Sequence, residues 1–127
     1  YLSSVLRGGF GNSVIPWLSA PIPACLPEIS WRVGGMAEHL EGIKGEADVV
    51  HLSNILDWST AEEAAEVLTA ARRALRPGGW VIVRQLNSPH DVPALGEGFE
   101  WPEAASRSLH ARERSFLYRR LWVGRAV

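Results

Sequence analysis

The sequence has 127 residues, of which 46% are hydrophobic and 21% charged, so it can bury a core and does not have the composition of a disordered chain. This length suits one domain or a piece of a larger one. The formal net charge of -1, with no basic excess, gives no sign of a nucleic-acid surface. Cys25 is the only cysteine, which excludes a disulfide framework and a cysteine-based metal set.

The same observations bear on location. A single cysteine fits a reducing cytoplasm. No run of about 18 apolar residues is present to span a membrane, and the first residues lack the basic and apolar regions of a secretory signal. We therefore expect a cytoplasmic protein that contacts a membrane at most peripherally and binds no nucleic acid.

Residues 1–28 predict an irregular linker segment. Prolines and glycines this close together forbid a long helix and disfavour an inner strand, so at most a short helix near Leu2–Leu6 is expected. Gly8-Gly9-Phe10-Gly11 does not form a dinucleotide-binding loop, because no convincing strand precedes it and Pro16 interrupts any following helix.

The next elements are short. Ile29–Val33 predicts a strand, and a short helix over Met36–Leu40 follows Gly34-Gly35. Ala47–Ser53 predicts a strand that is apolar on both faces, as in a covered parallel sheet.

A helix over about residues 60–75 is the clearest element. Thr60-Ala61-Glu62-Glu63 has the pattern of a capping box, and apolar residues then recur on one helical face up to Leu75. Pro77-Gly78-Gly79 stops the helix and turns the chain into a second apolar strand, Trp80–Leu86. Strand, helix and strand with short connections predict two parallel strands whose carboxyl ends lie at one edge of the sheet.

Polar side chains gather at that edge, where open α/β sheets bind ligands. Those after the first strand are Ser53, Asn54 and Asp57, and those at the end of the second are Arg84, Gln85, Asn87 and Ser88. An alternative interpretation is that Ser53 and Asn54 only cap a turn and that Asp57 begins the helix.

The tail predicts a last strand or hairpin. Ser115–Tyr118 and Leu121–Gly124 carry the apolar runs. The whole pattern predicts an α/β fold with an antiparallel C-terminal edge element.

The segment "ADVVHLSNILDWSTAEEAAEVLTAARRALRPGGWVIVRQL" resembles strand four to strand five of class I S-adenosylmethionine (SAM) dependent methyltransferases, through its helix ending in "LRPGG" and the strand "WVIVR". "HLSNILDW", "VIVRQL" and the closing "RERSFLYRRLWVGR" together resemble the SAM:diacylglycerol 3-amino-3-carboxypropyltransferases, which begin betaine-lipid synthesis. The resemblance runs from about Leu18 onward and is strongest over residues 47–86.

This resemblance implies a Rossmann-like domain that binds SAM and moves its aminocarboxypropyl arm to a lipid hydroxyl. Ser53, Asn54 and Asp57 match the polar segment after strand four, with Asp57 as the candidate base or orienter. Arg84 would pair with the carboxylate of the arm, or alternatively form an ion pair at the sheet edge, with Asp57 as one possible partner. Met36 occupies the position at which SAM enzymes commonly have Asp. Its side chain would pack either on the purine of SAM or in the protein core. No metal is implied.

One expected feature is missing. SAM domains of this type begin with a strand and a glycine-rich loop that lets the backbone approach the cofactor, and this sequence has no credible version of that loop. Residues 29–127 therefore resemble the carboxyl-terminal half of such a domain. Either the chain is a fragment, or it completes its sheet with another copy or a complementary chain. The alternatives are a SAM-dependent methyltransferase fragment and a non-catalytic module that serves as a binding or structural subunit.

Overall fold

The computed structural model describes residues 24–25, 27–113 and 115–127. The chain divides into two units, Tyr1–Trp31 and Arg32–Val127. The predicted helix near Leu2–Leu6 and the glycines at 8–11 lie outside the described residues. No helix among the described residues is long and apolar enough to cross a bilayer.

The predicted strand Ile29–Val33 is wrong. These residues form neither helix nor strand, and Trp31 and Val33 are 88% and 101% exposed. An apolar run becomes a strand only when another strand takes up its backbone hydrogen bonds, and none of the described strands does so here.

The second unit is a mixed α/β domain. Its described strands form one four-stranded sheet in the order β1-β2-β4-β3. β1 and β2 are parallel, and β4 is antiparallel to both β2 and β3. The elements in chain order are α3 (Met36–Glu41), β1 (Ala47–Ser53), the 3-10 helix η1 (Ile55–Trp58), α4 (Ala61–Ala74), β2 (Leu75–Gln85), α5 (Val92–Leu95), β3 (Phe99–Glu100), α6 (Glu103–Ala111) and β4 (Arg120–Ala126).

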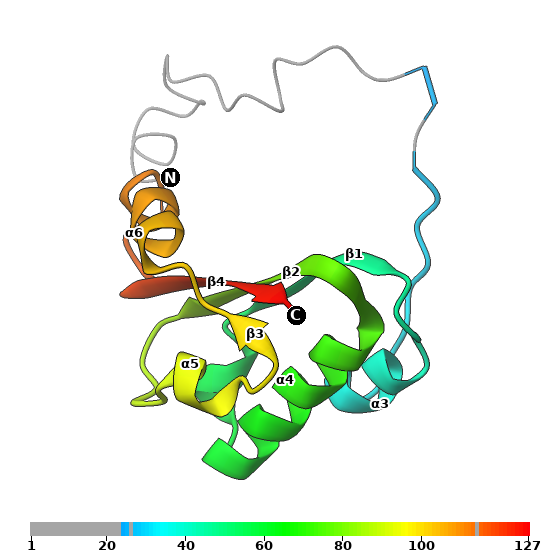
Figure 1. Ribbon diagram of the computed structural model, residues 1–127, viewed down its shortest axis with the longest axis horizontal. Helices are drawn as coiled ribbons and strands as arrows, with labels where there is room; N and C mark the ends of the chain where they lie inside the picture. Colours follow the sequence, from blue (N-terminus) through cyan, green and yellow to red (C-terminus); the bar gives the residue numbers. More distant parts are fainter. Residues whose placement is uncertain (1–23, 26, 114) are drawn as a thin grey trace, which may run out of the picture. The chain divides into compact units, whose positions relative to one another are not determined.

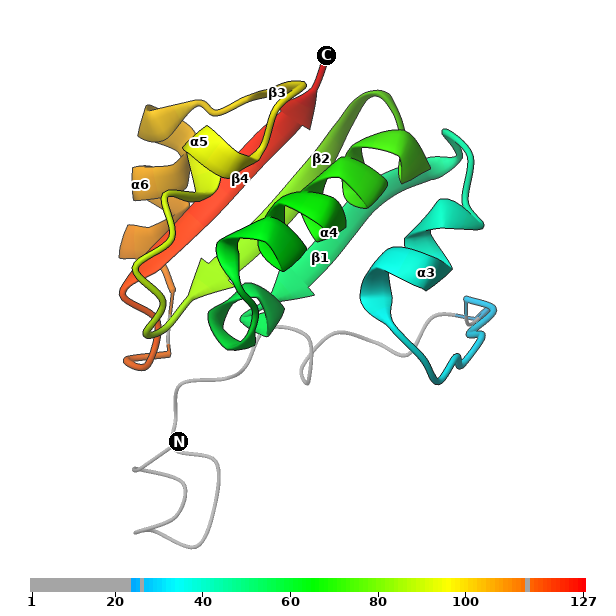
Figure 2. The same cartoon turned by 90° about the horizontal axis from the view of Figure 1, so that it is seen from below.

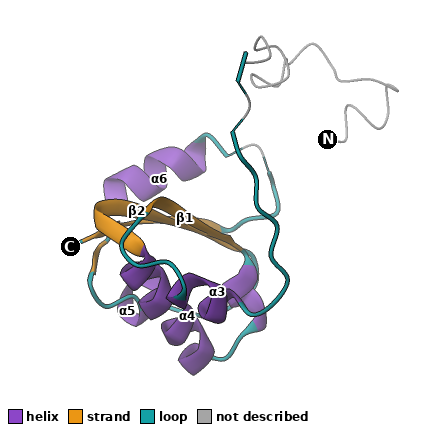
Figure 3. Cartoon of the chain, turned by 90° about the vertical axis from the view of Figure 1, so that its right-hand side faces the viewer, coloured by secondary structure: helices purple, strands orange, loops and turns teal. Residues whose placement is uncertain are grey.

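Figures 1 and 2 show the layers of this unit. Helices α3, α4 and α5 lie on one face of the sheet, and α6 lies on the other, beside β4. Figure 3 shows the same separation from the side. The expected strand-helix-strand unit of parallel β1 and β2 joined by α4 is confirmed, as is the antiparallel C-terminal strand. The result is a Rossmann-like strand-helix-strand unit whose sheet continues with the antiparallel strand β4 and then β3.

Local chemistry explains α4. The Thr60 hydroxyl accepts a hydrogen bond from the Glu63 amide at 3.2 Å, and the Thr60 amide donates to the Glu63 carboxylate at 2.8 Å. This is the predicted capping box. The helix ends at Ala74, and β2 begins at the next residue. The chain reverses direction between the end of α4 and Trp80, as predicted (Figure 2). Residues 77–79 are nevertheless assigned to β2, and its pairing with β1 is irregular there, moving from Ala47–Leu75 to Val49–Trp80.

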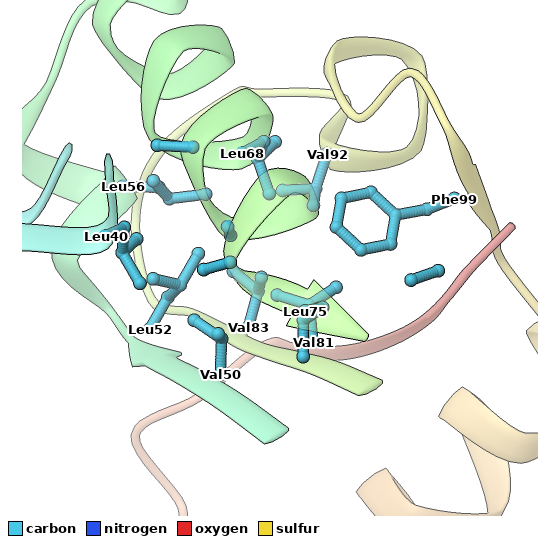
Figure 4. Close-up of a cluster of buried hydrophobic side chains, with 14 of the residues drawn as sticks. Leu40, Val50, Leu52, Leu56, Leu68, Leu75, Val81, Val83, Val92 and Phe99 are labelled. Carbon is cyan, nitrogen blue, oxygen red and sulfur yellow. The ribbon is translucent and has the colours of Figure 1, made fainter. Parts of the chain in front are cut away.

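The core lies between the sheet and α4. Leu52 of β1 and Val81 and Val83 of β2 point toward Leu68 of α4, and all four are at most 2% exposed (Figure 4). Leu40 of α3 and the aromatic ring of Phe99 close the two ends of the cluster.

The predicted burial of both faces of β1 is wrong. Val50 and Leu52 are buried, whereas Val49 is 51% exposed and His51 is also exposed. β1 is the terminal strand of the described sheet, and α6 packs against β4 rather than against β1. Only one face of β1 is therefore covered among the described residues.

The tail differs in part from its prediction. Leu121–Gly124 lies in β4 as expected, whereas Ser115–Tyr118 contains a turn at Phe116 and Leu117. Helix α6 was not anticipated, although Pro102 before it and Glu103 in its first turn are ordinary signals of a helix start.

Candidate functional site at the carboxyl ends of the parallel strands

Ser53 ends β1 in an uncommon backbone conformation. Its φ is 48°, in the left-handed region that few residues other than glycine adopt. Asn54 follows as the N-cap of η1, but its side chain makes no capping hydrogen bond. Both residues are half-buried, and within the described residues no hydrogen bond of either side chain is found. The Ser53 hydroxyl and the Asn54 amide thus have no hydrogen-bond partner among the described residues, and they stand at a backbone conformation of a kind that often occurs at functional sites.

Asp57 has a different environment. Its carboxylate accepts hydrogen bonds from the amides of Leu86, Asn87 and Ser88 at 2.8, 3.0 and 2.7 Å. Partial burial by itself would raise the pKa of Asp57, but these amide bonds and the Ser88 side chain outweigh it and lower that pKa below its usual value. A carboxylate held in this way is a weak base, so its geometry suits fixing the loop after β2.

Gln85 holds the same loop from inside. It is 5% exposed, and its amide group donates to the carbonyl oxygens of Ser88 and His90 at 2.9 and 2.8 Å. Its own oxygen accepts from the Trp122 indole at 2.9 Å. Both polar atoms of this buried amide are therefore hydrogen-bonded, the nitrogen to the loop after β2 and the oxygen to Trp122 of β4.

Arg84 lies on the other face of the sheet. Its guanidinium donates to the Glu113 carboxylate at 2.7 Å, lies beside the His51 ring, and stacks over Tyr118 at 5.6 Å from the ring centroid. The ion pair considered with Asp57 is not formed. Burial, and then the Arg84 charge, lower the pKa of His51, while Glu113 opposes this, so the neutral form of His51 is favoured beside the guanidinium.

Two hollows flank α6. One of about 450 Å³ is lined by Ile82, Arg84, Leu109, Arg112, Glu113 and Leu121. The other, of about 360 Å³, is lined by Glu103, Ser106, Arg107, His110, Arg120, Leu121 and Trp122. Neither contains Ser53, Asn54 or Asp57, so the structure does not bring Arg84 into one cavity with these three.

Met36 begins α3 and is half-buried against the core. Trp58 was not singled out as a site residue, yet it is 78% exposed at the end of η1, beside Ile55 at 37%. Sequence alone favours burial for tryptophan. No group of three potential metal ligands occurs among the described residues.

The chain has a distant similarity to a solved methyltransferase structure. No protein-family model matches the chain, and no curated protein matches it significantly. Among solved structures, the chain is similar to the antibiotic-resistance methyltransferase Kmr, at 23% sequence identity and a TM-score of 0.45 over 75% of this chain. The chain spans 56% of the length of that methyltransferase. The fold class itself follows from the strand order and the β1-α4-β2 unit described above.

Proposed function

We propose that this chain is the carboxyl-terminal half of a SAM-dependent transferase domain, and that the group transferred is the 3-amino-3-carboxypropyl arm, to a lipid hydroxyl. The proposal rests on the resemblance of "HLSNILDW" and "VIVRQL" to the aminocarboxypropyltransferases. One structural observation supports it: the polar side chains of Ser53 and Asn54, which have no hydrogen-bond partner in the described part of the chain, stand at a strained turn at the carboxyl end of β1.

The residues present fit one end of SAM. A hydroxyl and a carboxamide can hydrogen-bond the amino and carboxylate groups of the arm, and Ser53 and Asn54 offer these groups with no competing partner among the described residues. SAM would supply a sulfonium-activated carbon, whose reaction depends on positioning. Asp57 would then act as an orienter of the loop at 86–88, because its oxygens are occupied by amides. Met36 remains the proposed contact for the purine.

The first experiment is calorimetric titration of SAM into the purified chain. Binding that weakens at least about tenfold in Asn54→Ala or Ser53→Ala is expected, since each change removes a polar partner of the arm. Ser108→Ala, at an exposed serine on α6, is the matched control and should bind as the unchanged protein does. No SAM binding by the unchanged chain would refute the proposal and leave the non-catalytic module as its function.

The nucleoside that the reaction leaves behind distinguishes aminocarboxypropyl transfer from methyl transfer. Transfer of the aminocarboxypropyl arm breaks the bond from that arm to sulfur and leaves methylthioadenosine, whereas methyl transfer leaves S-adenosylhomocysteine. Incubation with SAM and diacylglycerol vesicles, followed by mass spectrometry, identifies which nucleoside forms. S-adenosylhomocysteine as the only product would replace the proposed activity with that of a methyltransferase fragment.

A further inference from the structure

The turn between α6 and β4 exposes two adjacent apolar side chains. Phe116 is 77% exposed and Leu117 is 53% exposed. Single exposed apolar residues are common on soluble proteins, but an aromatic and a leucine together at the tip of a turn can enter an apolar phase with little rearrangement.

Arginines surround this tip. Arg112, Arg119 and Arg120 are exposed, and none of them forms an ion pair with a described residue. The Arg120 guanidinium lies over the Trp122 ring at 5.8 Å, which leaves its charge in place. The neighbouring acid, Glu113, is already engaged by Arg84. The tip thus combines apolar side chains with uncompensated positive charge.

A second exposed apolar pair lies at the same edge of the sheet. The Arg119 amide donates to the Gln85 carbonyl at 2.9 Å, which ties the tip to the end of β2. Asp57 bonds the amides that follow β2, and this ties η1 to the same end. Ile55 and Trp58 of η1 therefore share the carboxyl edge with the tip, and Figure 2 shows the end of β1 and the α6-β4 connection at one end of the sheet.

We propose that this edge docks on the surface of an anionic lipid bilayer. The docking edge comprises Ile55, Trp58, Phe116 and Leu117 with Arg112, Arg119 and Arg120. Aromatic and leucine side chains bind at the boundary between headgroups and acyl chains, and arginines pair with lipid phosphates. Charge complementarity selects a bilayer with excess negative lipid, because none of the residues that the structure describes forms an ion pair with the arginines at the edge.

The docking edge deepens the proposed function, and its role in catalysis rests on that function. The carboxyl ends of β1 and β2 carry Ser53 and Asn54, so docking there would present these residues to lipid hydroxyls at the membrane surface. Binding to vesicles, however, requires no SAM. The two proposals can therefore fail independently.

The test is vesicle co-sedimentation with the full chain. The vesicles are phosphatidylcholine alone or an equimolar mixture with phosphatidylglycerol. We expect binding to the mixed vesicles, loss of at least about tenfold in partitioning for the double change Phe116→Ser and Leu117→Ser, and about a fivefold loss for each of Arg119→Gln and Arg112→Gln. Val127→Ser is the control, because Val127 is 58% exposed but follows the carboxyl end of β4, which lies at the opposite edge of the sheet from the docking edge.

The circular dichroism spectrum of each variant should match that of the unchanged chain, because the changed positions are exposed. Binding to mixed vesicles that weakens with salt and with the tip variants supports the docking edge. No binding to mixed vesicles by the unchanged chain overturns the proposal, as does equal loss in the Val127→Ser control. Vesicle binding without SAM binding retains the docking edge and refutes the proposed transferase.

Discussion

The two faces of the sheet differ although the same strands form both. On the face under α4, Leu52, Val81 and Val83 are at most 2% exposed. On the other face, Val49 is 51% and Trp80 38% exposed, and Arg84 with Glu113 forms an ion pair. Side chains alternate along a strand, so one sequence serves both faces. The comparison indicates that folding energy is concentrated under α4, while the opposite face and the carboxyl edge contribute less.

The largest expected effect comes from truncating the core under α4. Leu68→Ala should lower the free energy of unfolding by about 2–5 kcal/mol, because Leu68 is fully buried and its removal leaves a cavity. Urea denaturation measures this value. Val49→Ala on the open face is the control and should change it by about 0.5 kcal/mol or less. Equal losses at the two positions would mean that both faces are packed alike in solution.

Asp57→Asn tests the carboxyl edge and should cost about 1–3 kcal/mol, since a neutral amide accepts fewer and weaker bonds from residues 86–88. The folded state depresses the pKa of Asp57. The stabilisation is therefore complete above the ordinary aspartate pKa and is lost as the pH falls through the depressed value. Melting temperatures at pH 7 and at acid pH should accordingly show a difference between variant and parent that shrinks in acid.

Asp48→Asn is the matched control for that measurement. Asp48 pairs with Arg76 at 2.8 Å, but both side chains are mostly exposed, at 70% and 62%. Such pairs contribute about 0–1 kcal/mol. An unchanged melting temperature in Asp57→Asn, combined with lost SAM binding, would instead make Asp57 a residue of the binding site and contradict its assignment as a loop anchor.

Local signals predicted most of the parallel unit. The bounds of β1, the capping box at Thr60 and the strand after Pro77-Gly78-Gly79 follow from periodicity and capping chemistry over a few residues. Burial was predicted less well, because whether a face is covered depends on distant elements. β1 looked apolar on both faces, yet α6 covers β4 and leaves Val49 exposed.

The sequence predicted where in the fold the candidate site residues lie, but not which residues they contact. Sequence placed Asp57 and Arg84 at the ends of adjacent strands, and the structure agrees. The sequence did not indicate that the Asp57 and Arg84 side chains lie on different sides of the sheet, because the residues that they bond are distant in the sequence. Asp57 bonds amides 29 to 31 residues away, and Arg84 bonds Glu113, which follows an unanticipated helix.

A smaller effect is expected at the start of α4. Thr60→Ala removes the hydroxyl that accepts the Glu63 amide, and should lower the free energy of unfolding by about 1 kcal/mol. Urea denaturation again measures it. Thr69→Ala, at an exposed position within the same helix, controls for the loss of a threonine elsewhere and should cause no comparable loss. A loss confined to Thr60 sharpens the assignment of folding energy to the α4 side.

The smallest expected effect on stability is at Val49, where association is the informative measurement. We propose that copies of this chain associate through the edge and open face of β1, because an edge strand with an exposed apolar face can pair with another strand. Light scattering at high micromolar concentration should then show oligomers of the unchanged chain. Val49→Lys should shift them to monomers while changing the free energy of unfolding by about 0.5 kcal/mol or less.

Leu117→Lys, at a residue 53% exposed in the α6-β4 turn, is the control and should leave the oligomers intact. A clean monomer of the unchanged chain contradicts the proposal. Oligomers that Leu117→Lys disrupts and Val49→Lys does not would assign the contact to the α6-β4 turn, and the open face of β1 would have no part in assembly.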